Sequence, residues 1–208
     1  MDSNEQVVVK FTPEANLQLP QPSLLQFYKD IHERIYWITD EIDDGLLDLV
    51  SKIMDWNRED RYIPKENRKP IRLCINSVGG NLDIARVVVS IVEVSETPVM
   101  GIAMGIVASA ASMIFLACHK RVALANSTYL LHKGSIHGMS GNYEEVKRSM
   151  QDYEKTVNEL VSFYITHTLY SEEEVKEKLN SGDWYLYNDE AQKHGIIERE
   201  ITSINEII

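Results

Sequence analysis

Residues 105–109, Gly-Ile-Val-Ala-Ser, open an apolar run of small side chains that ends near Cys118. The preceding residues 97–103 have the composition of a strand, so we expect a strand that leads into a buried helix. Ser109 lies at this junction, where the first turn of a helix offers unpaired N–H groups and a partial positive charge. That position suits a nucleophile. A tightly packed core helix whose serines bond back to the preceding turn would give the same pattern.

Strand-like and helix-like segments alternate along the rest of the chain. Further strands are predicted from β-branched and aromatic residues at 34–38, 71–76, 121–124, 128–131 and 184–187. Further helices are predicted after Asp43-Asp44, at 82–94, at about 143–167, from a capping signature at Ser171 to about Gly182, and before Gly195. Strands that alternate with helices indicate an α/β domain with crossover connections.

Two segments lack this periodicity. Residues 1–23 contain Pro13, Pro20 and Pro22, so we expect an extended or mobile N-terminal arm before a single domain at residues 24–208. Ser23 is the expected cap of a short helix that ends at about Glu33. Residues 57–70 are charged and aperiodic, which predicts a loop.

Composition excludes several classes of function. The formal net charge of −11 disfavours nucleic acid and anionic membrane surfaces as partners, since both select basic patches. No stretch reaches the ~18 apolar residues of a membrane span. Cys74 and Cys118 lie in apolar contexts typical of reduced core thiols, which fits a cytoplasmic protein. No CxxC or HExxH spacing occurs, so neither a metal site nor a cofactor is predicted.

A serine nucleophile needs a base and a group that orients the base. His132 ends the apolar segment Tyr129-Leu130-Leu131 and leads into a loop, a common place for functional side chains. Structural roles at helix ends, in a basic turn, on amphipathic helices or in a loop account for the other five histidines, which are His32, His119, His137, His167 and His194.

Two further elements complete the candidate site. Asp183 stands between a helix end and an aromatic strand, where a half-buried carboxylate can hold an imidazole, although a carboxylate that caps a turn would look the same. Gly79-Gly80 follows a predicted strand, and such glycines let backbone N–H groups turn toward an oxyanion.

Together these segments resemble the ClpP family, the serine peptidase subunits of the ATP-dependent Clp protease, from Arg34 to about Glu198. The family's Asn-Ser-Pro-Gly-Gly turn is similar to Asn76-Ser77-Val78-Gly79-Gly80, and its Gly-x-Ala-Ala-Ser segment to residues 105–109. Its Lys-Arg…Leu-Pro-Asn-Ser…Ile-His run is similar to Lys120-Arg121, Leu124-Ala125-Asn126-Ser127 and Leu131-His132, and its C-terminal pattern to Asp183, Leu186, Glu190-Ala191 and Gly195-Ile196-Ile197.

The resemblance implies a crotonase/ClpP-like α/β fold of repeated ββα units with a protruding handle helix, here residues 143–167. It implies hydrolysis of peptide bonds inside a ring-shaped chamber, with Ser109 as nucleophile, His132 as general base and Asp183 as the group that orients the imidazole. The backbone N–H groups of Gly80 and Ala110 would form the oxyanion hole, and Ser112 would pack inward. The loop before the handle would pair with the polypeptide substrate.

The resemblance also implies a homo-oligomer fed by an AAA+ unfoldase of the ClpX or ClpA type. The family's proline is Val78 here, its Met-Gly after the nucleophile is Ala110-Ala111, its Gln-Pro after the histidine is Lys133-Gly134, and its Asp-Arg contact across rings is Ser181-Gly182. A heptameric ring is therefore the expected assembly. The larger form would be a stack of two such rings, with fourteen subunits in all.

Other functions fit parts of the pattern. The main alternative is a non-catalytic ring subunit or scaffold that pairs with an active paralogue. An acyl-CoA-handling enzyme of the same fold has no use for an aligned Ser-His-Asp set. A membrane-linked Ser-Lys peptidase of related fold is disfavoured, because His132 and Asp183 supply a complete alternative to lysine.

Overall fold

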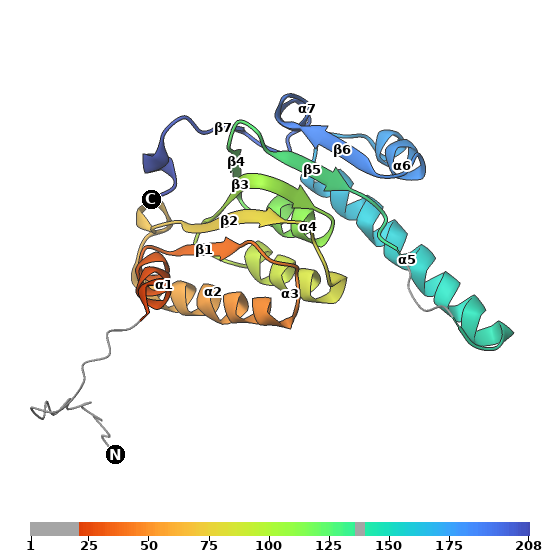
Figure 1. Cartoon of the computed structure of the whole chain (residues 1–208), viewed down its shortest axis with the longest axis horizontal. Coiled ribbons are helices and arrows are strands. Elements are labelled where there is room, and N and C mark those ends of the chain that lie inside the picture. The colour runs from red at the N-terminus through yellow and green to blue at the C-terminus, as the bar shows by residue number, and fades with distance from the viewer. Residues whose placement is uncertain (1–20, 136–139) are drawn as a thin grey trace, which may run out of the picture.

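A computed structural model describes residues 21–135 and 140–208, which form one parallel-rich sheet packed against helices (Figure 1). The strands are β1 (Ile35–Ile38), β2 (Ile71–Ser77), β3 (Val99–Ala108), β4 (Lys120–Ala123), β5 (Thr128–Leu131), β6 (Trp184–Tyr187) and β7 (Arg199–Glu200). The helices are α1 (Pro22–His32), α2 (Leu47–Glu59), α3 (Leu82–Glu93), α4 (Ala110–Ala117), α5 (Tyr143–His167), α6 (Glu172–Asn180) and α7 (Asn188–Lys193). The predicted N-terminal arm lies outside the described residues, except for residues 21–23.

The sheet order is β1-β2-β3-β4-β7, with every neighbouring pair parallel. Strand β3 is long enough to serve two neighbours: its first half pairs with β4 and its second half with β5. Strand β6 then adds to β5 in the antiparallel sense. Beyond the ends of β1 and β2, an isolated parallel bridge pairs Ile42 with Gly80. Each of the first three strands is therefore followed by a short second strand segment and then by a helix. This is the predicted repeat of ββα units.

Helices α2, α3 and α4 lie side by side against one face of the sheet (Figure 1). Every residue of α4 is buried, which explains its small side chains, because a helix that touches sheet and helices on all sides needs close backbone approach. A second cluster of buried residues covers the other face; it consists of Ile35, Cys74, Ile102, Val122, Ile201 and Ile207.

Helix α5 extends beyond the body of the protein in Figure 1, where it forms the predicted handle. Its buried residues are Leu160, Val161 and Tyr164, all in its C-terminal half. The N-terminal half of α5 therefore projects from the domain, whereas the C-terminal half packs into it.

Three sequence predictions are corrected. Helix α2 continues through Asn57 to Glu59, and short 3-10 turns follow at Asp60–Tyr62 and Lys65–Asn67, because the polar side chains of this predicted loop have partners inside the protein. Ser23 lies inside α1, where Pro22 starts the helix and Gln21 is the N-cap residue. Strand β3 reaches Ala108, five residues beyond its predicted end, because β5 supplies a partner for its second half.

Candidate active site

Ser109 stands at the turn between β3 and α4 with φ 54° and ψ −126°. Left-handed backbone of this kind is strained for a residue with a Cβ and persists only where the surroundings impose it. Strand β5 imposes it here, since the Ser109 N–H donates to the Leu130 carbonyl at 2.8 Å. The turn thus projects a serine side chain from the first turn of a buried helix.

The glycine turn after β2 packs directly on this serine. Gly79 has φ 95°, and a Cβ added there would lie 2.7 Å from both the Ala108 carbonyl oxygen and the Ser109 Cβ. No side chain larger than hydrogen fits between the two turns. The predicted pairing of the Gly79-Gly80 turn with the serine segment is therefore a close backbone contact.

The structure brings His132 and Asp183 to the same place. The His132 Nε2 atom lies 2.5 Å from the Ser109 Oγ atom, and its Nδ1 atom lies 3.5 Å from the Asp183 Oδ1 atom. Both residues flank paired strands: Leu131 of β5 is opposite Trp184 of β6. Antiparallel pairing therefore sets Asp183 beside the histidine, although α5, α6 and their loops separate the two residues in the sequence.

Exposure differs between these two side chains. The Asp183 side chain is 59% exposed and that of His132 is 26% exposed. A separation of 3.5 Å is longer than the ~2.7–2.9 Å of a charge-assisted hydrogen bond. The serine–histidine contact is thus the tight one, and the carboxylate is held loosely behind it.

A cavity of about 370 Å³ opens in front of Ser109 and His132, and both Gly80 and Ala110 line it. Neither the Gly80 nor the Ala110 backbone N–H donates to a partner within residues 21–135 and 140–208. Ala110 is the first residue of α4, where the N–H has no intrahelical acceptor. Two backbone donors therefore line the cavity together with the serine.

Competing nucleophiles are inert. Ser112 packs inward as expected: it is 1% exposed, and its hydroxyl donates to the Ser109 carbonyl at 2.6 Å. Burial raises the pKa of the Cys74 and Cys118 thiols to about 12, so both are neutral thiols at physiological pH.

Three of the other histidines make structural contacts, as the sequence predicts. The His119 Nδ1 atom accepts the Val99 N–H at 2.9 Å, and burial lowers the pKa of this imidazole. His167 lies 3.1 Å from Glu93, and His194 stacks on Tyr170 with ring centroids 3.8 Å apart. His137 lies outside the described residues.

Sequence reasoning missed the contribution of α5 to the site. Tyr153, Thr156, Leu160 and Tyr164 line the cavity along with residues of the glycine and serine turns. Their spacing of three or four residues marks one face of a helix. The sequence spacing therefore predicts that these residues share one face of α5. Only the fold shows that this face forms a wall of the cavity.

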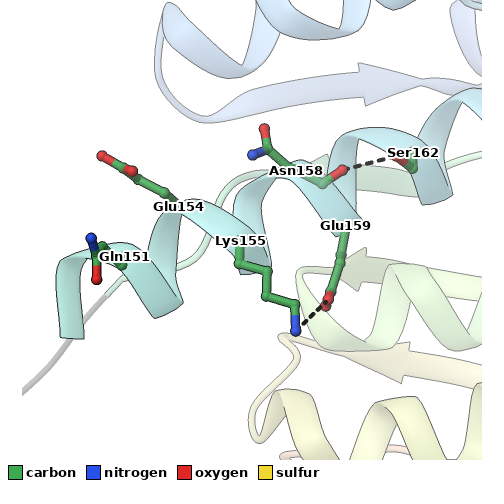
Figure 2. Close-up of a pocket in the computed structure, with 6 residues that line it drawn as sticks. All are labelled: Gln151, Glu154, Lys155, Asn158, Glu159 and Ser162. Atoms are coloured by element: carbon green, nitrogen blue, oxygen red, sulfur yellow. Dashed lines mark hydrogen bonds and ion pairs between the residues drawn. The ribbon is translucent and has the colours of Figure 1, made fainter. Parts of the chain in front are cut away.

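A second hollow, of about 610 Å³, runs along α5 (Figure 2). Its lining is polar and comes from this one helix, and it consists of Gln151, Glu154, Lys155, Asn158, Glu159 and Ser162. Lys155 and Glu159 form a loose pair at 3.9 Å in this hollow (Figure 2). None of the triad residues lines it, so the candidate chemistry belongs to the smaller cavity.

Comparison with known proteins supports one family. The Clp protease family model matches residues 23–203. The ATP-dependent Clp protease proteolytic subunit 2 of Treponema pallidum (strain Nichols) is 33% identical over 135 residues, which are 64% of this chain and 67% of that protein. Subunit 3 of the same name from Synechococcus sp. (strain CC9605) is 28% identical over 206 residues, or 94% and 98% of the two chains.

A solved structure with the same fold is that of a point mutant of ClpP1 from Listeria monocytogenes, with a TM-score of 0.74. It is 22% identical, and the match covers 88% of this chain and 99% of that one. No helix within the described residues is both long and apolar enough to cross a membrane. The chain belongs to the Clp protease family and has the ClpP-like fold.

Proposed function

We propose that this chain is a serine endopeptidase subunit that hydrolyses peptide bonds of unfolded polypeptides inside a ring-shaped chamber. The observation that carries the proposal is the 2.5 Å contact between the Ser109 Oγ atom and the His132 Nε2 atom at the cavity wall. A hydroxyl that shares its proton with an imidazole is the arrangement that activates a serine for attack on a carbonyl.

The steps follow from these positions. Ser109 attacks the peptide carbonyl while His132 takes the hydroxyl proton, and His132 then gives that proton to the leaving amine. Water attacks the resulting acyl-enzyme by the same route and releases the second product. Asp183 favours the imidazole tautomer with a proton on Nδ1 and stabilises its cationic form.

The negative charge that develops on the carbonyl oxygen needs donors, and the Gly80 and Ala110 N–H groups take this role. Loss of one such donor costs about 2.7–4 kcal/mol of transition-state stabilisation in other serine peptidases. Because both donors are backbone groups, Val78 and Ala110 are compatible with the role despite their departure from the family's residues.

Substrate binding is expected to rely on main-chain contacts. Apolar side chains of Leu82, Met113 and Leu160 line the cavity, which suits an extended peptide with an apolar residue near the cleaved bond. The loop proposed to pair with the peptide precedes α5, and its residues 136–139 lie outside the described residues. A peptide added as a strand binds mainly through backbone hydrogen bonds, so weak sequence specificity is expected.

Assembly into a heptameric ring, with two stacked rings as the larger form, accompanies this function. Helix α1 supports it, since none of its residues is buried and Leu24, Leu25, Phe27 and Tyr28 are exposed. Exposed apolar residues gathered on one helix are typical of a subunit contact. An AAA+ unfoldase of the ClpX or ClpA type and a cytoplasmic location complete the proposal, in line with the ATP-dependent proteases that the relatives' names describe.

Treatment with a fluorophosphonate tests the proposal. We expect a single adduct in the intact mass of the purified protein and none in the Ser109→Ala variant, which keeps the Cβ and the fold. An adduct that persists in Ser109→Ala would contradict the assignment of the nucleophile.

A second candidate function is a non-catalytic ring subunit, and the exposed Asp183 at 3.5 Å from His132 favours it. This candidate predicts an assembled ring in which this chain carries no adduct, both when it is alone and when it is mixed with an active paralogue. The adduct on this chain separates the two candidates, and size-exclusion chromatography with light scattering on the same samples shows whether unlabelled protein is assembled, as the second candidate requires.

A further inference from the structure

Tyr164 lies beneath the candidate site and is 1% exposed. It comes from the C-terminal half of α5, and it lines the cavity beside Ser109 and His132. A buried phenol is costly unless its hydroxyl finds a partner. The acceptor of this hydroxyl is the backbone carbonyl of the candidate general base, and Ser112 lies nearby on the nucleophile side.

Ser112 is the neighbour on the nucleophile side. Burial raises the pKa of Tyr164 and the nearby Ser112 side chain acts against it, while the Ser112 hydroxyl itself donates to the Ser109 carbonyl at 2.6 Å. Ser109 has strained backbone, so a contact on its carbonyl restrains the turn that projects the nucleophile.

The acceptor is on the base side. The Tyr164 hydroxyl lies 3.5 Å from the His132 carbonyl oxygen. The hydroxyl has one proton, and its acceptor is this carbonyl, since the Ser112 hydroxyl is committed to Ser109. Burial raises the pKa of Tyr164 to about 12, so the group keeps this proton at physiological pH.

Helix α5 holds the segment after β5 at a second point. The Tyr153 hydroxyl donates to the Gly134 carbonyl at 3.2 Å. Residues 153 and 164 are eleven positions apart, which is close to three helical turns, so both side chains lie on one face of α5. Their acceptors are the carbonyls of His132 and Gly134, two residues apart in the segment that follows β5, so α5 contacts this segment at two points.

We propose that Tyr164 is a positioning residue that holds the general-base segment against α5 through the contact of its hydroxyl with the His132 carbonyl, next to the Ser112 side chain that restrains the nucleophile turn. The proposal rests on the proposed peptidase function. It assigns the positioning role to the hydroxyl, because the aromatic ring only fills space in the core.

Two tyrosine-to-phenylalanine variants test this role. Tyr164→Phe keeps the ring and removes the hydroxyl that contacts the His132 carbonyl. Tyr129→Phe is the matched control, since Tyr129 is also 1% exposed and its hydroxyl contacts Asn188 at 3.1 Å, away from the triad. Both variants lose one buried hydroxyl contact, so they are expected to shift the melting temperature to a similar extent.

The kinetic readout is fluorophosphonate labelling together with cleavage of a short fluorogenic peptide by the assembled full-length protein. We expect Tyr164→Phe to lower kcat and the labelling rate about tenfold with little change in KM, since a small misalignment of reacting groups costs rate rather than binding. Tyr129→Phe is expected to react at the wild-type rate. Equal rates for wild type and Tyr164→Phe would overturn the proposal, as would an equal loss in both variants.

A crystal structure of each variant gives a readout that does not depend on activity. The expected result is a lost hydrogen bond between Ser109 Oγ and His132 Nε2 in Tyr164→Phe and a retained one in Tyr129→Phe. A retained contact in Tyr164→Phe would refute the positioning role. Wild-type protein that never labels would instead refute the peptidase function, and the crystallographic comparison would still decide the role of Tyr164.

Discussion

Two residues other than glycine have positive φ within the described part of the chain, Arg34 at 59° and Ser109 at 54°. Both stand at a junction between a helix and a strand, and both are held by groups distant in sequence. The guanidinium of Arg34 is buried and bonds both Asp60 carboxylate oxygens, at 2.6 and 2.8 Å. The Ser109 hydroxyl faces a cavity and contacts an imidazole.

The two turns show that backbone strain alone does not identify a functional site. At Arg34 the strain accompanies a buried ion pair, which anchors the start of β1 to the end of α2. At Ser109 the strained backbone presents a hydroxyl to a cavity. The difference lies in what the side chain faces, so substitutions at the two turns should separate stability from activity.

The largest expected effect is on turnover at the Ser109 turn. Ser109→Ala should lower kcat for peptide cleavage by more than about 10⁴-fold, as loss of the nucleophile does in other triad enzymes. Alanine keeps the Cβ at the same φ, so the urea midpoint should stay within error of wild type. A destabilised Ser109→Ala protein would mean that the hydroxyl is structural, as Asp60 is.

The next effect is on stability at the Arg34 turn. Asp60 is 1% exposed and also accepts a hydrogen bond from the Thr97 hydroxyl at 2.8 Å. Asp60→Asn removes the buried counter-charge of Arg34 and leaves only the exposed Glu59 carboxylate at 3.1 Å, which should lower the free energy of unfolding by about 3 kcal/mol. Urea unfolding measures this loss. The fluorophosphonate labelling rate of the folded fraction should not change; a lower rate would show that the two turns are coupled.

Gly79→Ala should affect both properties at the Ser109 turn. The added Cβ would lie 2.7 Å from the Ala108 carbonyl oxygen and from the Ser109 Cβ, and the residue has a φ that disfavours a side chain. We expect a loss of about 1–3 kcal/mol in unfolding free energy and at least a roughly tenfold lower labelling rate. Gly134→Ala is a useful control for the strain, since Gly134 also has positive φ but an added Cβ there meets no atom within 4 Å.

Acid should distinguish the Arg34 turn further. The hydrogen bond from Arg34 lowers the pKa of the Asp60 carboxyl, the Thr97 hydroxyl acts in the same direction, and burial opposes them. The contribution of Asp60 to stability is therefore fully present above its unfolded pKa of about 3.9 and is lost as the pH falls through the lower folded value. The stability difference between wild type and Asp60→Asn should be constant from about pH 5 to 8 and shrink below about pH 4 in urea titrations.

The smallest effect measures the strain at Ser109 itself. Ser109→Gly should be more stable than Ser109→Ala by about 1 kcal/mol, because glycine tolerates positive φ at the cost of some backbone entropy. Arg34→Gly should instead be less stable than the wild type, since loss of the ion pair with Asp60 outweighs the relief of backbone strain. If Ser109→Gly were no more stable than Ser109→Ala, the turn would carry no measurable strain.

Sequence alone determined the α/β class, the family and the candidate residues. Apolar periodicity reports the secondary structure because buried faces repeat every two or 3.6 residues, and the capping box at Ser171 defines its helix start locally. The triad candidates were found because a serine after a strand, a histidine at the end of one and an aspartate before one are unusual at those positions. Such local signals need no knowledge of which elements become neighbours.

Tertiary structure alone decided the rest. Strand β3 gained five residues because β5 pairs with the last three of them. The polar residues 57–60 became helix and turn because Arg34, Asn57 and Asp60 bond to groups 25 to 40 positions away. Tyr164 carried no sequence signal beyond helical spacing, because its role depends on which two segments α5 covers. Contacts between residues far apart in sequence depend on how the elements pack together, and local patterns do not encode that packing.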